Sequence, residues 1–300
     1  MAQAGLIAID WGTSSLRGAR LDHRGRVLEE RSSAQGILNV PRDQFATVLE
    51  ALCADWPRPE GSVTLISGMA GSKQGWVEAP YCPCPAGFDE IAGKLKWVEP
   101  HRIAIVPGLC CEHAHAPDVM RGEETQIFGA LQLTGLRDGL FVLPGTHSKW
   151  AQVKDGRVVS FKTFMTGEVF ALLSQHSILA KTIGTIAALD SNAFLQGVAQ
   201  AAAGGGILHN AFSARTLGLF ERRNAAELAS LLSGLVIGEE LRSRHLQAGT
   251  DVVLVGSSTL VHRYTQALLQ HGAHAHALGA EATWAGLHAL AQHIDPHDHC

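Results

Sequence analysis

Two stretches of the chain share one order of apolar runs and turns. Residues 5–34 begin with an apolar run, Leu6 to Ile9, which enters a Gly-Thr turn and is followed by two extended stretches joined by a tight turn at 22–25. The stretch that starts near Leu140 has the same order, with its tight turn at 154–156. Short alternating runs between turn residues are typical of strands. The pattern predicts two antiparallel three-stranded meanders.

Helical spacing and short apolar runs alternate after each meander. The spacing predicts helices over 44–56, 124–133, 168–180, 260–268 and 281–293, with alanine- and leucine-rich helices over 192–246. Apolar runs predict strands over 62–67, 101–106, 251–255 and 273–278, and 75–87 is expected to be an ordered loop. We therefore expect an α/β protein with two domains, 1–135 and 136–300. Each domain is expected to be a mixed sheet, an antiparallel meander plus parallel strands, flanked by helices.

Composition narrows the class of protein. Of the 300 residues 46% are hydrophobic and 17% are charged, which is enough apolar material to bury a substantial core. The formal net charge of -4 offers no basic surface for nucleic acid or acidic membranes. No apolar run reaches about 18 residues and the N-terminus lacks a signal segment, so we expect a cytoplasmic protein that binds neither membrane nor nucleic acid. The six cysteines show neither a disulfide framework nor the CxxC pairs of a zinc site.

The first Gly-Thr turn combines groups that suit an anion. Gly12 is followed by Thr13 and Ser14, so backbone amides and small hydroxyls lie together where glycine permits a close approach. Asp10 ends the preceding strand, and one carboxylate there suits the hydrated Mg²⁺ of a nucleotide, because Mg²⁺ takes few carboxylates and keeps several waters. The alternative is an aspartate that only caps the turn. The repetition of the motif favours the functional interpretation.

The second Gly-Thr turn has similar chemistry. It is not a P-loop, because it lacks the GxxxxGK[ST] spacing and lies inside a hairpin. Because side chains alternate along a strand, the lysine of this motif could face the side opposite to the serine that precedes it, so the role of the lysine stays open. An ordinary hairpin turn is the alternative. Two such turns on two similar units indicate a polyphosphate held from two sides, and hence a nucleotide-dependent phosphotransferase. The candidate nucleotide contacts in this turn are Gly145, Thr146, His147, Ser148 and Lys149.

A third glycine turn follows the apolar run at 251–255. Gly256 and Ser257 lead into a helix whose N-terminus suits adenosine or its phosphates. Any doubly wound sheet contains such units, so this feature is weak evidence by itself.

Charged residues open two of the predicted helices. Glu123 and Glu124 are candidates for a general base that takes the proton of an attacking hydroxyl, and Arg121 beside them suits an anionic substrate. Carboxylates at a helix N-terminus also serve as plain partners of the helix dipole, which is the alternative. Glu168 precedes another helix in a polar corner, where a helix cap is the favoured interpretation and a substrate contact the second.

A loop in the first half combines a hydroxyl, a cation, backbone amides and aromatic side chains. This mixture suits a small, polar, anionic ligand such as a sugar acid. An ordinary loop with a packed tryptophan is the alternative. The candidate substrate residues here are Gly71, Ser72, Lys73, Trp76 and Tyr81.

Several longer segments, in order and spread over nearly the whole chain, carry a family resemblance. They are IAIDWGTSSLRGARLD (7–22), GMAGSKQGW (68–76), APYCPCPA (79–86), DVMRGEETQIFGAL (118–131), PGTHSKW (144–150), FMTGEVFALLSQHSIL (164–179) and LSGLVIGEE (232–240). With these segments the chain resembles the 2-dehydro-3-deoxygalactonokinase family, within the sugar kinase/Hsp70/actin superfamily.

The resemblance implies two ribonuclease-H-like domains with an ATP cleft between them. It implies a kinase of galactonate breakdown that uses ATP and Mg²⁺ to phosphorylate the 6-hydroxyl of 2-dehydro-3-deoxy-D-galactonate, giving the 6-phosphate and ADP. The two phosphate loops of the superfamily correspond to the two Gly-Thr turns, and its adenosine segment to Gly256 and Ser257. Related sugar kinases carry an aspartate as base where this chain has Glu123 or Glu124, and the spacing to Gly145 favours Glu124.

Other functions stay open on the sequence. A kinase for the epimeric 2-keto-3-deoxygluconate or another sugar acid would differ by one or two hydrogen bonds. An actin-like ATPase or regulatory nucleotide-binding module belongs to a different class, which acceptor-independent ADP release would reveal. The expected partners are a small sugar acid and ATP, and a homodimer is one assembly that the sequence leaves open.

Overall fold

The computed structural model describes residues 5–183 and 188–294, which form two compact units. Unit 1 consists of the described residues of Met1–Gly139, Ala151–Lys162 and Leu278–Cys300, and unit 2 of those of Leu140–Trp150 and Thr163–Ala277. The expected division cut the chain once, between 135 and 136. The structure differs, because each unit contains more than one segment and the last helix groups with unit 1.

Unit 1 is built on a six-stranded mixed sheet in the order β3-β2-β1-β4-β7-β6. The expected meander is confirmed, because β1 and β2 pair antiparallel, as do β2 and β3. β4 and β7 then extend the sheet in parallel, and β6 closes the edge antiparallel. The strands are β1 (Leu6–Trp11), β2 (Leu16–Leu21), β3 (Val27–Ser33), β4 (Val63–Gly68), β6 (Lys96–Glu99) and β7 (Ile103–Ile105).

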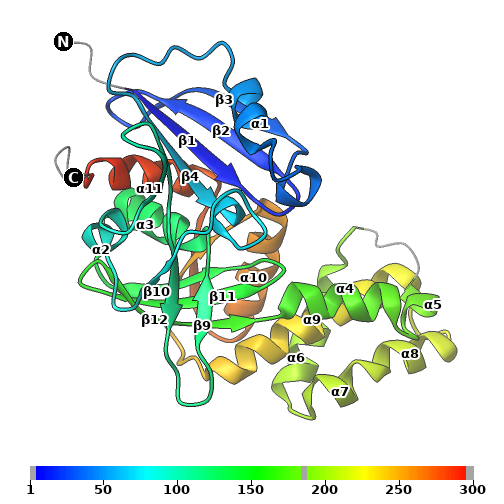
Figure 1. Ribbon diagram of the computed structural model, residues 1–300. Coiled ribbons are helices and arrows are strands. Elements are labelled where there is room, and N and C mark those ends of the chain that lie inside the picture. Colours follow the sequence, from blue (N-terminus) through cyan, green and yellow to red (C-terminus); the bar gives the residue numbers. More distant parts are fainter. Residues whose placement is uncertain (1–4, 184–187, 295–300) are drawn as a thin grey trace. The chain divides into compact units, whose positions relative to one another are not determined.

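Helices cover both faces of this sheet. β1 is apolar at nearly every position because it is buried on both sides, as central strands next to parallel neighbours commonly are. On one face α1 (Phe45–Leu52) packs Phe45 and Leu49 into a core with Trp11. On the other, α11 (Glu281–Ala291) contacts β1, β2 and β4 and lies along α3 (Glu123–Thr134), as Figure 1 shows.

Unit 1 also contains several short elements that were not predicted from the sequence. A three-stranded sheet in the order β5-β8-β9 contains short, irregular segments, one of them inside the loop expected at 75–87. Its strands are too short for two-residue alternation to be recognised. The elements are β5 (Tyr81–Pro83), β8 (Gly108–Cys111), β9 (Asp118–Met120), α2 (Phe88–Ala92), and the 3-10 turns η1 (Ile37–Asn39) and η2 (Met69–Gly71).

The helix pair α3 and α11 gives a stability prediction. A Cβ on Gly129 would lie 1.7 Å from the carbonyl oxygen of Ala282, so the backbones can approach only because residue 129 has no side chain. We expect Gly129→Ala to cost at least about 2 kcal/mol through overpacking. Urea denaturation measures the change. The exposed Leu133→Ala on the same helix should change stability by less than about 1 kcal/mol, and an equal loss in both variants would contradict the close-approach argument.

Unit 2 contains the core of a five-stranded sheet in the order β12-β11-β10-β13-β14. Gly139, residues 151–162 and Leu278 of this sheet group with unit 1. β10 and β13 pair in parallel, and Val142, Val252 and Leu254 face a core that α6, α9 and α10 complete. The strands are β10 (Gly139–Leu143), β11 (Ser148–Lys154), β12 (Arg157–Phe164), β13 (Asp251–Val255) and β14 (His274–Leu278).

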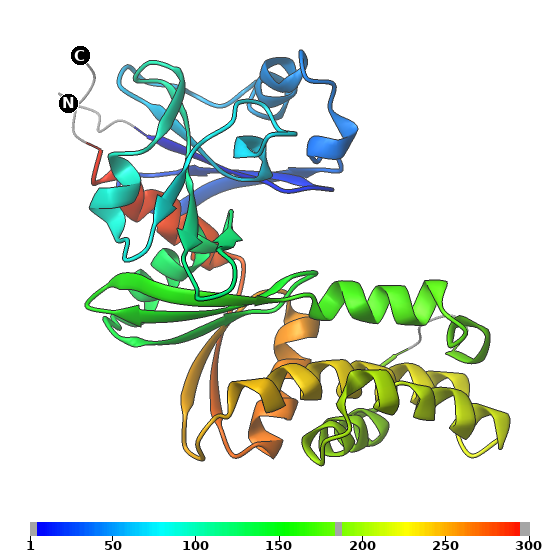
Figure 2. The same ribbon diagram turned by 60° about the horizontal axis from the view of Figure 1, so that its bottom comes forward.

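The long helical region expected over 192–246 is confirmed as a bundle in unit 2. Its central helix α9 starts at a capping box, in which Asn224 accepts from the amide of Glu227 and Glu227 accepts from that of Asn224. Figure 2 shows α4 and α9 side by side. The helices are α4 (Thr166–His176), α5 (Ala180–Ile183), α6 (Ser191–Ala202), α7 (Gly206–Asn210), α8 (Phe212–Leu219), α9 (Ala225–Arg244) and α10 (Ser258–Gln270). Within 5–183 and 188–294 no helix has the length and apolar character needed to cross a membrane.

Candidate active site

The carboxyl ends of β1 and β4 meet the start of α3 in unit 1. Asp10 pairs in register with Ser67, and the Ser67 hydroxyl lies 2.8 Å from that of Thr125 on α3. Gly68 and Gly122 connect these segments, with φ of 93° and 106°, a backbone region that favours glycine. A Cβ on Gly122 would lie 3.2 Å from Cα of Gly68. Two glycines thus bring the end of β1 and the first turn of α3 together.

Glu124 lies at the centre of this arrangement. Its side chain is fully buried, and its carboxylate accepts from the Gly122 amide at 2.7 and 2.9 Å and from the Thr125 hydroxyl at 3.3 Å. Burial, followed by the charge of Glu123, raises the pKa of Glu124 to about 7. A carboxyl group that titrates near neutral pH is suited to act as a general base.

Glu123 has a different environment one position earlier. It is only half-buried, and its carboxylate accepts from the backbone amide of Arg121 at 2.9 Å. Glu123 is therefore the more accessible carboxylate and Glu124 the one with the perturbed pKa. The two side chains differ by about 100° around the helix, so they face different surroundings.

Asp10 forms an ion pair that the sequence analysis did not anticipate. Its Oδ2 lies 2.5 Å from Nη2 of Arg17 on the neighbouring strand, and the Arg17 guanidinium lies over the ring of Trp284. The Asp10 side chain keeps 21% of its surface exposed, and its Oδ1 is directed towards Gly68. A single, partly exposed carboxylate fits a Mg²⁺ ion that is otherwise held by water and phosphate. Among the described residues no group of three or more His, Cys, Asp or Glu side chains is arranged for a metal.

The first Gly-Thr turn follows directly. The Gly12 amide donates to the Ser15 carbonyl at 2.9 Å, and the carbonyls of Gly12 and Thr13 accept from the amides of Ile37 and Leu38. These bonds hold the turn against the segment that contains η1. Thr13 and Ser14 are exposed, so the hydroxyls expected to contact phosphate face solvent.

Arg121 is a buried cation with unused hydrogen-bonding capacity. Only 9% of the residue is exposed, and its guanidinium lies 4.4 Å from the centre of the Tyr81 ring. Nη2 donates to the Ala79 carbonyl at 2.8 Å, whereas Nε and Nη1 have no hydrogen-bond partner among the described residues. Desolvated N–H groups of a cation are costly unless something accepts from them. They are suited to an anionic ligand.

The structure brings together part of the expected substrate loop. A Cβ on Gly71 would lie 2.8 Å from Nη1 of Arg121, and the hydroxyl of the next residue, Ser72, is buried without a hydrogen-bond partner among the described residues. Gly71, Tyr81 and Arg121 therefore lie together, and we call them, with Ser72 as the next residue in the chain, the arginine site. Lys73 is exposed.

Trp76 has a structural environment rather than that of a ligand wall. Its ring centre lies 6.3 Å from that of Trp11 and 6.2 Å from that of Phe45. It packs against the apolar core between β1 and α1. The packed tryptophan, which was the alternative interpretation of this loop, describes its contacts.

The second Gly-Thr turn is exposed at Thr146 and His147 but not at the two residues after them. Ser148 is fully buried and its hydroxyl donates to Glu240 at 2.8 Å, while Nζ of Lys149 donates to the Thr163 hydroxyl at 2.8 Å. Ser148 and Lys149 are neighbours on β11, so their side chains lie on opposite faces of the strand, the first engaged with Glu240 and the second with Thr163. The phosphate role expected of these two side chains stays a prediction. The backbone amides of the turn and the Thr146 hydroxyl stay as candidates.

Two more of the residues that were predicted as ligand contacts lie near this turn in unit 2. Glu168 donates its amide to the Thr146 carbonyl at 3.0 Å, and its carboxylate pairs with Nε2 of His147 at 2.6 Å. Its contacts are thus with the second Gly-Thr turn. A Cβ on Gly256 would lie 3.5 Å from the Pro144 carbonyl, so the glycine turn after β13 borders the same region, with Ser257 exposed at the start of α10.

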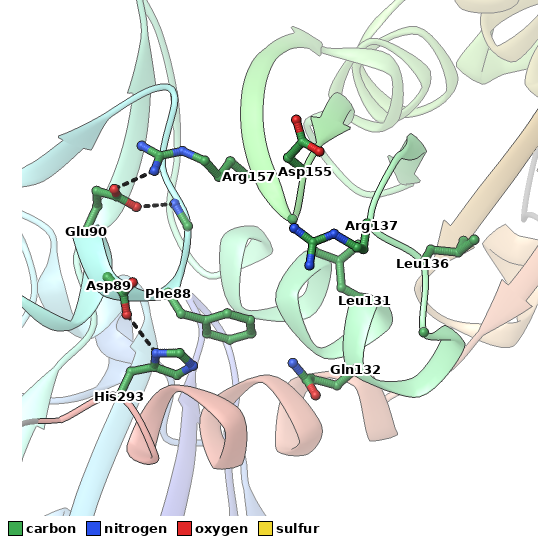
Figure 3. A pocket seen from close by; sticks show the side chains of 13 residues that line it. Phe88, Asp89, Glu90, Leu131, Gln132, Leu136, Arg137, Asp155, Arg157 and His293 are labelled. Atoms are coloured by element: carbon green, nitrogen blue, oxygen red, sulfur yellow. Dashed lines mark hydrogen bonds and ion pairs between the residues drawn. The ribbon is translucent and has the colours of Figure 1, made fainter.

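A cavity of about 520 Å³ lies elsewhere in unit 1 (Figure 3). α2, the end of α3, the β11–β12 turn and His293 line it, and no expected site residue does. Two pairs of its charged or titratable side chains contact one another: Arg157 lies 2.7 Å from Glu90, and His293 lies 2.8 Å from Asp89. The cavity is therefore not the site that the sequence indicated.

Sequence reasoning missed two partners of the expected residues. Arg17 was not singled out, although it is the basic residue two positions after Ser15 on the next strand, where it faces Asp10. Glu240 was quoted only within a family segment, and its position soon after the largely apolar run at 228–238 of the same helix was the available signal.

Comparison with known proteins gives a consistent result. The family model of 2-keto-3-deoxy-galactonokinase matches residues 10–290. A Rhizobium meliloti (strain 1021) protein assigned as a 2-dehydro-3-deoxygalactonokinase, DgoK1, is 40% identical over 298 residues, covering 96% of this chain and 97% of its own. The 2-dehydro-3-deoxygalactonokinase of Escherichia coli (strain K12) is 35% identical over 291 residues, covering 96% and 98%.

A solved structure agrees over the whole fold. The crystal structure of a Sinorhizobium meliloti protein, described as belonging to the same kinases, has a TM-score of 0.90 and 39% sequence identity, and the match covers 97% of this chain and 99% of that one. The expected family and the two-domain α/β fold are therefore confirmed. The chain belongs to the 2-keto-3-deoxy-galactonokinase family.

Proposed function

We propose that the protein transfers the γ-phosphoryl group of ATP to the 6-hydroxyl of 2-dehydro-3-deoxy-D-galactonate, with Mg²⁺, to give the 6-phosphate and ADP. The relatives named as 2-dehydro-3-deoxygalactonokinases support this substrate, because they match this chain over nearly its full length. Since ATP is an intracellular metabolite, we place the reaction in the cytoplasm.

One observation on this chain's own residues carries the proposal. Arg121, buried with two unpartnered N–H-bearing nitrogens, and Glu124, a carboxyl with a pKa near 7, lie three positions apart at the start of α3. A sugar acid has a carboxylate at one end and a hydroxyl at the other. The arginine suits the first group and the glutamate the second.

The proposed mechanism assigns binding to the arginine site. The Arg121 guanidinium and the Ser72 hydroxyl bind the carboxylate end of the acid, and the face of the Tyr81 ring supports the guanidinium. Lys73 adds a positive charge at the exposed rim. This fixed end orients the chain of the acid so that its terminal hydroxyl can reach a base.

Proton transfer is assigned to Glu124. Its carboxylate accepts the proton of the 6-hydroxyl as the oxygen attacks the γ-phosphorus, and the bond from that phosphorus to the leaving ADP oxygen breaks. Backbone amides and exposed hydroxyls of the two Gly-Thr turns, at Thr13 and Ser14 and from Gly145 to His147, donate to phosphate oxygens. Asp10 would hold Mg²⁺ through its waters, and the ion would neutralise charge on the phosphates.

The function is tested by measuring ADP release with ATP and Mg²⁺ in three parallel reactions. They contain 2-dehydro-3-deoxygalactonate, its gluconate epimer, or no acceptor. Turnover that requires the galactonate acid is the expected result. Faster turnover with the epimer would reassign the substrate but retain the kinase. ADP release that neither acid increases would overturn the sugar-acid function in favour of an ATPase.

The pKa of Glu124 gives a pH prediction. A general base is active only when deprotonated, so kcat/KM for the acid should fall by about tenfold per pH unit as the pH drops below about 7. Above pH 7 it should become constant until another group titrates. Measuring kcat/KM for the acid as a function of pH, at saturating ATP, tests the expected fall below pH 7. A profile that stays flat from pH 5 to 7 would contradict the assignment of Glu124 as the base.

A further inference from the structure

Four side-chain donors converge on one buried carboxylate in unit 2. Oε1 of Glu240 accepts from the Ser148 hydroxyl at 2.8 Å and from the Trp150 indole at 2.5 Å. Oε2 accepts from the Tyr264 hydroxyl at 2.7 Å and from the Thr166 hydroxyl. Only 3% of Glu240 is exposed. The donors come from β11, α4 and α10, between 24 and 92 positions away in the chain.

Two of the four donors flank the second Gly-Thr turn. Ser148 is the residue at which the turn enters β11, and Thr166 is the first residue of α4. α4 in turn lies against the turn, because a Cβ on Gly167 would be 2.5 Å from the Gly145 carbonyl. Glu168 adds the amide bond to the Thr146 carbonyl. Glu240 is therefore hydrogen-bonded to the start of β11 and to the start of α4, the two segments that contact the exposed part of the turn.

The hydrogen-bond geometry defines the direction of the protons. The Trp150 indole can only donate, and four donors to two carboxylate oxygens match the acceptor capacity of an ionised carboxylate. Burial raises the pKa of Glu240, and the hydrogen bonds from its four donors act in the opposite direction by favouring the ionised form. The guanidinium of Arg244, which lies over the Trp150 ring at 5.2 Å, supplies a nearby positive charge. With its proton directed to Glu240, the Ser148 hydroxyl is not available to donate to phosphate.

We infer that Glu240 is a positioning residue for the nucleotide: through Ser148 and Thr166 it holds the second Gly-Thr turn so that the backbone amides of that turn bind phosphate oxygens. This inference rests on the proposed function in that it takes the turn as a phosphate site. Glu240 itself touches no phosphate. It acts through the geometry of residues 145–148 and the start of α4.

Glu240→Gln is the test variant, because it keeps the size of the side chain and replaces one acceptor oxygen by a donor. Whichever way the amide is turned, two of the four donors then face an NH₂ group. We expect the Kd for ADP with Mg²⁺, measured by calorimetry, to rise at least about tenfold. The KM for the sugar acid should stay within about twofold, because the arginine site belongs to the other unit.

Tyr264→Phe is the matched control for a merely structural role. It removes one donor from the same carboxylate, but Tyr264 lies on α10, whereas Ser148 and Thr166 belong to the two chain segments that flank the turn. We expect a lower melting temperature in both variants, with the ADP Kd changed only in Glu240→Gln. Thr166→Val removes a donor at the start of α4 and should also weaken ADP binding. This variant replaces Glu240→Gln as the test if Glu240→Gln does not fold.

The outcomes separate this inference from the proposed function. ADP binding within twofold of wild type in both Glu240→Gln and Thr166→Val would overturn the positioning role. An equal loss of ADP affinity in Tyr264→Phe would overturn it as well, since a general loss of packing would then explain the effect. If the wild type binds ADP tightly but does not phosphorylate the acid, the proposed function fails while the role of Glu240 is still measured by ADP affinity.

Discussion

Glu124→Gln should lower kcat by about 10² to 10⁴ while the protein still binds ATP and the sugar acid. Glutamine has nearly the same shape and can accept from the Gly122 amide, but it cannot take a proton from the 6-hydroxyl. The loss is therefore expected in the chemical step and not in KM. Steady-state kinetics at pH 8, where the wild-type carboxyl is ionised, measure it.

Glu123→Gln is the matched control, because it makes the same chemical change one position away. It removes a charge from a half-buried residue whose carboxylate accepts from the Arg121 amide, so a small effect on kcat is expected. Near-normal turnover in Glu124→Gln together with a large loss in Glu123→Gln would assign the base to Glu123.

Stability gives an independent check that Glu124→Gln is folded. The folded pKa of about 7 exceeds the reference value of 4.5, so the native state binds the proton more tightly than the unfolded chain. The stabilising contribution of the protonated carboxyl is complete below about pH 4.5 and is lost as the pH rises through 7. At pH 8 the ionised carboxylate then opposes folding by about 3 kcal/mol, so the glutamine variant should melt at a higher temperature than wild type at pH 8. A lower melting temperature at pH 8 would contradict the raised pKa.

Arg121→Lys should raise the KM for the sugar acid by about 100-fold. Lysine keeps the charge but loses the planar fork that can bind a carboxylate through two parallel N–H groups and stack on Tyr81. Nε and Nη1, the nitrogens that lack a partner among the described residues, are those that the substitution removes or displaces. The Kd for ADP should change less than twofold, because Arg121 is assigned to the acid alone.

Arg102→Lys controls for the chemistry of the substitution. Arg102 lies in the same unit, is exposed, and pairs with Glu99 at 2.9 Å at the surface, so its replacement should leave the KM for the acid unchanged. If Arg121→Lys binds the acid as tightly as wild type, the buried guanidinium serves the fold and the carboxylate end of the substrate is held elsewhere.

The proposed site combines rigid and adjustable parts. Backbone contacts among Gly68, Gly122 and the end of β1 place Glu124, and such contacts leave little freedom for its carboxylate. The arginine site instead lies on loops and short elements, η2 and β5, where a ligand can supply the missing acceptors. Binding of the carboxylate end is therefore expected to depend on the loop residues, and proton transfer on the helix start.

Much of the fold follows from local patterns in the chain. The two meanders were predicted because each strand of β1 to β3 and of β10 to β12 ends at turn residues that interrupt an apolar or alternating run. The start of α3 was predicted at Glu124 from helical spacing, one residue from its observed start at Glu123. Short elements such as β5 and α2 were not predicted, because three to five residues contain less than two periods of any pattern.

The chemistry of single residues was visible in the sequence, and their partners were not. Residue type and position marked Asp10, Arg121 and Glu124 as candidates, since a carboxylate or guanidinium beside a glycine turn or helix start is recognisable locally. Only the tertiary structure decided that Arg121 has unused N–H groups beside Gly71 and that Ser148 faces Glu240, 92 positions away. Only it decided that α11 belongs to unit 1 through its contact with α3. The physical reason is that burial, the pKa and the direction of a hydrogen bond depend on neighbours in space, and chain folding brings those neighbours from distant positions that local periodicity does not relate.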